Sequence, residues 1–116
     1  MAIYSFEGKV PAIHETAFVA DSAQIIGNVK IESNCYIGPT AVIRGDYGTI
    51  NIGEGTAIEE GCIIHARPQG NTIIGKRVTV GHGSMIHNAE IMDYAVIEIW
   101  TIHVKFTTFC KTYLKL

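Results

Sequence analysis

Three histidines, His65, His82 and His87, are the side chains of this 116-residue sequence best suited to chemistry. A neutral imidazole is a good ligand for borderline metal ions. Three imidazoles leave a fourth coordination position open for water, which is the arrangement of a catalytic zinc site. Such a site requires a fold that brings these three side chains together.

A six-residue repeat predicts that fold. This period differs from the 3.6 of a helix and the 2 of a strand, and it is typical of a parallel β-helix in which three hexapeptides make one triangular coil. In many hexads a glycine follows the aliphatic residue and a small residue takes the fifth position. We interpret that glycine as helping the chain to turn. The repeat aliphatics are Ile13, Val19, Ile25, Ile31, Ile37, Ile43, Ile52, Ile58, Ile64, Ile74, Val80 and Ile86.

Counting in threes assigns these aliphatics to three faces. Keeping the register requires three extra residues between Ile43 and Ile52 and four between Ile64 and Ile74. Both insertions contain turn residues, so both are expected to be loops. The first face holds Ile25, Ile43, Ile64 and Ile86; the second holds Ile31, Ile52, Ile74 and Ile91; the third holds Val19, Ile37, Ile58, Val80 and Ile97.

The same count places the histidines on two faces. His65 and His87 are 22 residues apart, and without the four-residue insertion this is one 18-residue coil, so they stack on the first face. Arg44 stacks one coil before His65. His82 lies on the third face, where we expect it to share a column with Glu59, out of reach of the other two histidines.

A threefold homotrimer would complete the set, because it packs the first face of one subunit against the third face of the next. His65 and His87 of one subunit would then meet His82 of its neighbour. The alternative, that each histidine is a polar surface residue of the prism, stays open. His14 and His103 are given no role.

Two segments, AVIRGDYGTINIGEGTAIEEGCIIHARP and TIIGKRVTVGHGSMIHNAEI, resemble the gamma-class carbonic anhydrases and their hexapeptide-repeat relatives. The resemblance runs from about Phe6 to Ile97. It implies an all-β fold: a single-stranded, left-handed parallel β-helix of about five coils. It also implies homotrimers with a metal ion at each subunit interface, where the counterparts of Arg44 and Asp46 form a salt-bridge network.

The activity implied by the resemblance is that of a lyase: the reversible hydration of carbon dioxide to bicarbonate by a metal-bound hydroxide. Zinc is the expected ion, although iron and cobalt also accept three imidazoles. The candidate catalytic residues are Arg44, Asp46, Glu59 and Glu60.

Three positions bear on how fast such an enzyme would be. Glu59 replaces the family's glutamine; it can accept a proton, but its charge is expected to raise the pKa of the bound water. Ala57 replaces an asparagine and Glu60 replaces the common aspartate. These changes favour slow hydration and leave the three ligands intact.

Two other functions remain open at this point. One is a hexapeptide acyltransferase, in which His87 or His82 acts as a general base on an acceptor while acyl-coenzyme A lies along the prism. The other is a catalytically weak or non-catalytic metal-binding trimer. Bound metal and an acyl-transfer assay distinguish the three.

Composition limits partners and location. A net charge of −2 with dispersed basic residues argues against nucleic acid as a partner. With no run of 18 apolar residues and no visible signal peptide, we expect a cytoplasmic protein that does not enter membranes. Three widely spaced cysteines argue against a disulfide framework, and Cys35 and Cys62 fit buried packing positions.

The repeat predicts one domain, 1–97, followed by an atypical tail, 98–116. No glycine follows Gly83, and the tail mixes β-branched, aromatic and lysine residues. We expect it to be strand-like or irregular, without the C-terminal helix found in the family. Whether a trimer forms without that helix is left open.

Overall fold

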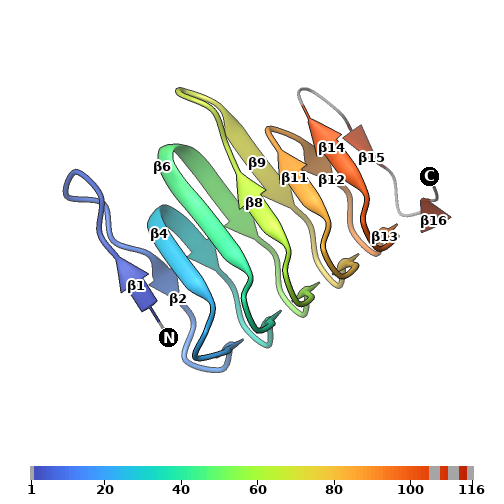
Figure 1. Ribbon diagram of the computed structural model, residues 1–116, viewed down its shortest axis with the longest axis horizontal. Coiled ribbons are helices and arrows are strands. Elements are labelled where there is room, and N and C mark those ends of the chain that lie inside the picture. Colours follow the sequence, from blue (N-terminus) through green and yellow to red (C-terminus); the bar gives the residue numbers. More distant parts are fainter. Residues whose placement is uncertain (1, 105–107, 110–112, 115–116) are drawn as a thin grey trace.

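The chain winds into a triangular β-helix in a computed structural model that describes residues 2–104, 108–109 and 113–114 (Figure 1). All the described elements are strands, and the strand pairing between successive coils is parallel. Five coils end in turn with β3, β5, β7, β10 and β13, the last of which finishes at Ile97. The expected all-β, left-handed parallel β-helix of about five coils is therefore confirmed.

The first face carries the histidine column. Its register places Ile25 beside Ile43, Ile43 beside Ile64, and Ile64 beside Ile86, as the sequence count predicts. The strands are β1 (Ala2–Tyr4), the first halves of β4 (Gln24–Ile31) and β6 (Val42–Ile52), β8 (Ile63–His65), β11 (Met85–His87) and β14 (Ile102–Val104).

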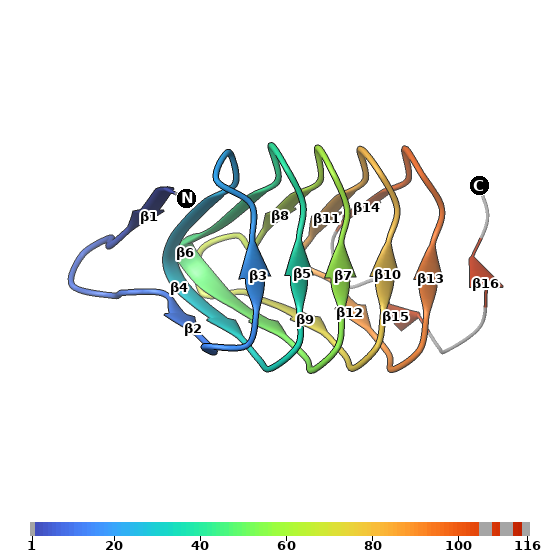
Figure 2. The same cartoon turned by 90° about the horizontal axis from the view of Figure 1, so that it is seen from below.

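The second and third faces also follow the predicted register, with Ile52 beside Ile74 and Ile58 beside Val80. Figure 2 shows the third face as a ladder of short strands. The second face has β2 (Ala12–Ile13), the second halves of β4 and β6, β9 (Asn71–Ile74), β12 (Glu90–Ile91) and β15 (Thr108–Phe109). The third has β3 (Phe18–Val19), β5 (Tyr36–Ile37), β7 (Ala57–Ile58), β10 (Thr79–Val80), β13 (Val96–Ile97) and β16 (Tyr113–Leu114).

One of the two predicted loops is wrong. The three-residue insertion before Ile52 lies inside β6, which stays extended around the corner from Val42 to Ile52. This continuity is possible because β6 pairs with β4 on one side and with both β8 and β9 on the other. The second insertion, residues 66–70, is outside strands and contains a turn, as expected.

The glycine that follows the repeat aliphatic does not turn the chain, contrary to our interpretation. At Gly53, an added Cβ would lie 2.6 Å from the backbone of Gly75 in the next coil, so only a hydrogen fits there. The turns instead use residues in the left-handed region. Asn34 and Arg77 have φ of 57° and 51° at equivalent corners of their coils.

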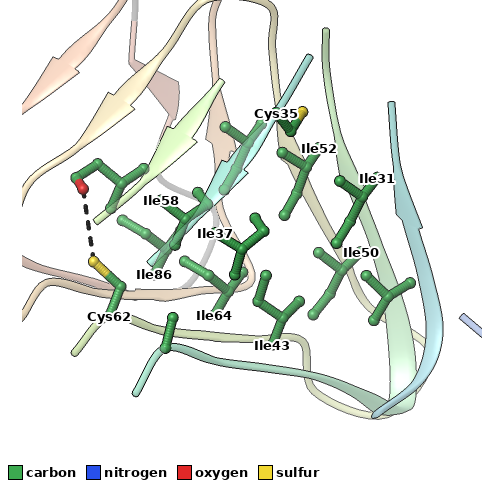
Figure 3. Packing of buried hydrophobic residues seen from close by; sticks show 14 of the residues in the cluster. Ile31, Cys35, Ile37, Ile43, Ile50, Ile52, Ile58, Cys62, Ile64 and Ile86 are labelled. Carbon is green, nitrogen blue, oxygen red and sulfur yellow. Dashed lines mark hydrogen bonds between the residues drawn. The ribbon is translucent and has the colours of Figure 1, made fainter. Parts of the chain in front are cut away.

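The core is a stack of aliphatic side chains, one from each face of each coil, and most of them are isoleucine (Figure 3). Ile37, Ile43, Ile58 and Ile64 are fully buried. Burying such a side chain contributes about 1.5–3 kcal/mol, so the columns are the main source of stability. They also fix the register, because a one-residue slip would turn every isoleucine outward.

Cys35 and Cys62 are buried free thiols, as predicted. The Cys62 thiol shares its hydrogen between the carbonyl oxygens of Val80, at 3.6 Å, and Gly81, at 3.1 Å. Figure 3 draws one hydrogen bond from this thiol. Burial raises the pKa of Cys62 to about 11, which keeps this thiol protonated and unreactive near neutral pH. Cys110 lies outside the described residues.

The described parts of the tail continue the parallel pairing: β14 pairs with β11, β15 with β12 and β16 with β13. The division at residue 97 stays a prediction, and residues 105–107, 110–112 and 115–116 lie outside the described part. Within the described residues, no helix is long and apolar enough to cross a membrane.

Candidate functional site

His65 and His87 end adjacent strands of the first face and lie side by side. They occupy paired positions of β8 and β11, and their ring centroids are 5.0 Å apart at an interplanar angle of 40°. Arg44 on β6 pairs with His65 from the other side. The predicted column of Arg44, His65 and His87 is therefore present on the first face.

Asp46 holds His65 in place. Its Oδ1 atom lies 3.1 Å from Nε2 of His65, and its Oδ2 lies 3.5 Å from Nη1 of Arg44. The carboxylate is nearly buried, whereas the Arg44 side chain is half exposed. Within this chain Arg44 thus pairs with Asp46; the salt-bridge network across a subunit interface stays a prediction.

His87 offers a free ligand atom. Its Nε2 is shielded from solvent and has no hydrogen-bond partner among the residues that the structure describes. Burial lowers the pKa of His87, and the neighbouring His65, Arg67 and Arg44 lower it further. A neutral imidazole with an unpartnered, buried nitrogen is the state that binds a metal ion.

His82 lies on the third face, just beyond the end of β10, as the sequence predicts. The predicted column is wrong by one residue. Because Ile58 pairs with Val80, His82 lies opposite Glu60 and not Glu59. Nδ1 of His82 is 2.7 Å from Oε2 of Glu60.

The pKa values of Glu59 and Glu60 are shifted in opposite directions. Burial raises the pKa of Glu59, and the adjacent Glu60 carboxylate raises it further. The pKa of Glu60 is lowered, first by a hydrogen bond to its own backbone N–H and then, against the effect of burial, by His82. Glu59 is thus the carboxylate of the two that more readily holds a proton.

One chain alone does not assemble the three histidines. In the described part of the chain, the set of three potential ligands whose atoms all lie within 4.8 Å of one another is Glu59, Glu60 and His82. His65 and His87 belong to a different face. This separation agrees with the predicted division of the ligands between two subunits, and the trimer itself stays a prediction.

Tyr36 belongs to this region, although the sequence argument overlooked it. Its hydroxyl donates a long hydrogen bond, 3.4 Å, to Oε1 of Glu60. Its ring stacks on Phe18 with centroids 5.5 Å apart and planes 8° apart. The spacing of Phe18 and Tyr36, one coil, was the signal that could have revealed the aromatic pair.

A cavity of about 300 Å³ adjoins Asp46 and was not foreseen either. One wall is the N-terminal turn, which folds over β6 so that Phe6 meets Tyr47 edge to face at 5.4 Å. The first ten residues lie outside the hexapeptide repeat, so the repeat could not place them. Asp46 is among the residues that line this cavity.

Two of the three expected ligands, His65 and His87, are placed so that they could bind one metal ion. His87 supplies an unpartnered, buried nitrogen, and His65 lies next to it with its orientation fixed by Asp46. A carboxylate that orients a ligating imidazole is a common feature of zinc sites. Two imidazoles are an incomplete zinc site, so a third ligand from another protomer is required.

Comparison with known proteins identifies the family. The model of the bacterial transferase hexapeptide (six repeats) matches residues 11–45. A crystal structure of a hexapeptide transferase family protein from Anaplasma phagocytophilum superposes with a TM-score of 0.75 and 32% identity, covering 98% of this chain and 71% of that one. This chain is a member of the hexapeptide transferase family. The recognition of a gamma-class-like hexapeptide-repeat protein is thereby confirmed at the level of the superfamily.

Two more relatives extend the comparison. The carnitine operon protein CaiE of Escherichia coli K12 is 42% identical over 109 residues, which covers 84% of this chain and 56% of CaiE. A putative acetyltransferase of Bacillus cereus gives a TM-score of 0.80 at 28% identity, covering 94% of this chain and 74% of that one. The chain thus spans about half the length of the curated relatives it matches.

Proposed function

We propose that this hexapeptide transferase family member is one subunit of a metal-dependent enzyme that hydrates carbon dioxide to bicarbonate at a site shared between subunits. The observation that carries the proposal is the buried, unpartnered Nε2 of His87 beside the ring of His65. A buried polar atom without a partner costs free energy, so a fold that keeps one has a use for it.

The proposed ligands are His65 and His87 of one subunit and His82 of the next. When bound, zinc held by three imidazoles acidifies a water molecule enough to supply a nucleophile near neutral pH. Iron or cobalt would satisfy the same ligands. The shared site requires a closed, rotationally symmetric homotrimer, in which each first face meets a neighbouring third face.

The other residues of this chain have separate tasks. Asp46 orients His65, and Arg44 forms an ion pair with Asp46. Glu59 receives a proton, because burial and its neighbour Glu60 raise its pKa. The cytoplasmic location expected from the sequence is part of this proposal.

The test is metal analysis of the purified chain together with stopped-flow measurement of carbon dioxide hydration. We expect one metal ion per chain and a hydration rate that His87→Ala abolishes. Glu15→Ala, on an exposed turn outside the site, serves as the matched control and should leave both unchanged. Stoichiometric metal without hydration would point to a catalytically weak metal-binding trimer, and a chain free of metal would contradict the proposal.

A second candidate is acyl transfer from acyl-coenzyme A. It is favoured by the transferase family model and by the similarity to the Bacillus cereus protein. The paired His65 and Asp46 resemble a general base with its orienting carboxylate, although in this chain Asp46 lies against Nε2. Thiol release from acyl-coenzyme A in the presence of a chelator would support this function over the first.

A further inference from the structure

One ring nitrogen of His82 lies in direct contact with a carboxylate. Nδ1 lies 2.7 Å from Oε2 of Glu60. That oxygen is shielded from solvent and accepts no hydrogen bond of standard geometry from the described residues, so its close polar contact is the one with His82. The neighbouring Glu59 also has a carboxylate oxygen within 4.8 Å of a ring nitrogen of His82, although it belongs to a different column. Glu60, at 2.7 Å, is the carboxylate in direct contact and so the group placed to select the tautomer of this imidazole.

Glu60 is itself held from the opposite side. Its Oε1 accepts the long hydrogen bond from Tyr36, whose ring is stacked flat on Phe18. Both carboxylate oxygens thus face a defined partner. The side chain of Glu60 is half exposed, so without Tyr36 more of its rotamers would turn toward water.

The backbone around His82 is also fixed. The amide of Gly83 donates to the carbonyl of Glu60 at 2.9 Å, and the amide of Trp100 donates to the carbonyl of His82 at 2.9 Å. Backbone hydrogen bonds to the preceding and the following coil therefore fix the main chain at His82 and Gly83. Only the side-chain torsions of His82 remain to be set, and the contact with Glu60 sets them.

From this geometry we infer that Glu60 is a positioning residue: it binds the Nδ1–H of His82 and leaves Nε2 as the ligand atom that faces outward. The purpose of this arrangement rests on the proposed metal site. Imidazoles that ligate metals usually donate their other N–H to a carboxylate, which fixes the tautomer and raises ligand basicity. Glu60 thus does for His82 what Asp46 does for His65, through the opposite ring nitrogen.

The tautomer can be measured without any metal. Long-range ¹H–¹⁵N correlation spectra of the chelator-treated wild-type chain at pH 8.5, where imidazole side chains are neutral, report which nitrogen of His82 carries the proton. We expect Nδ1–H in the wild type and in Glu60→Gln, whose amide oxygen still accepts. Glu60→Ala should lose that preference. Glu54→Ala is the matched control, because Glu54 occupies the same position of the preceding hexad.

A second measurement connects the tautomer to metal binding. Zinc titration against a competing chelator should show affinity 10- to 100-fold weaker for Glu60→Ala, with Glu60→Gln within about threefold of the wild type. Tyr36→Phe should give a smaller loss in the same direction.

The outcomes separate the two proposals. An Nε2–H tautomer in the wild type, or one unchanged by Glu60→Ala, overturns the positioning role; the wild-type spectrum alone decides this even where a variant fails to fold. A wild-type chain with the Nδ1–H tautomer that binds no zinc overturns the proposed function and leaves the tautomer assignment standing.

Discussion

His87→Phe should make the metal-free protein more stable while abolishing its response to zinc. In the wild type, Nε2 of His87 is buried without a partner among the described residues, which costs about 1–3 kcal/mol of stability. Phenylalanine removes that atom and keeps a ring of similar shape against His65, whose centroid is 5.0 Å away. Part of the gain is offset, because the larger phenyl ring must fit a half-buried position.

The net effect follows from these two contributions. We expect the variant to unfold with a free energy about 1 kcal/mol above that of the wild type in chelator, a rise in Tm of roughly 4–8 °C. With zinc at 100 times its Kd, the wild type should gain about 2.7 kcal/mol and the variant nothing. The order of stability therefore reverses when zinc is added.

The assay is urea denaturation followed by circular dichroism, at one fixed protein concentration because oligomers unfold in a concentration-dependent way. Each protein is measured with chelator and with zinc. A variant less stable than the wild type by 1 kcal/mol or more in chelator would refute the reasoning, since Nε2 of His87 would then have a stabilising partner. Equal stabilisation of both proteins by zinc would refute the assignment of His87 as a ligand.

Two further predictions concern the coil itself. Gly53→Ala should lower the free energy of unfolding in denaturant by about 3 kcal/mol or more, because its Cβ would lie 2.6 Å from rigid backbone. Gly8→Ala is the comparison: Gly8 has φ of +79° but no atom within 4 Å of the added Cβ, so the loss should be only about 1 kcal/mol. Equal losses in the two variants would contradict this explanation. The raised pKa of Cys62, about 11, means that the unfolded chain releases this thiol proton first, so stability is intact below pH 8 and falls as the pH rises toward 11. The loss should be on the order of 3 kcal/mol and absent in Cys62→Ser, and parallel pH profiles for the two proteins would disprove it.

Much of the fold was predictable because one large aliphatic side chain in about every six residues enters the core. Counting from Ile25 to Ile43 and from Ile64 to Ile86 gave the observed register, and with it the stacking of His65 on His87. The count for His82 was off by one residue. That histidine is two positions after Val80, so it falls opposite Glu60, and only the paired strands made this plain.

Other features left no signal in the repeat. The corner residues with positive φ are three positions after the repeat aliphatic, where Gly55 is flanked one coil away by Asn34 and Arg77, so residue type alone did not mark the corner. The contact between Asp46 and His65 depends on how β6 rounds the corner, which the insertion length alone does not determine. The tail pairs as β14 to β16 although its hexapeptide pattern has decayed, because backbone pairing needs no particular side chains.

The central claim is that two protomers build each metal site, and subunit complementation tests it most directly. His65→Ala and His82→Ala chains, each purified and assayed alone, should bind no zinc. When the two variants are unfolded together in equal amounts and refolded, about one quarter of the sites should bind zinc. A site is complete only where a His82→Ala chain supplies the first face and a His65→Ala chain supplies the third, and each of these conditions is met about half of the time. Stoichiometric zinc in the His82→Ala protein alone, or none in the refolded mixture, would contradict the account.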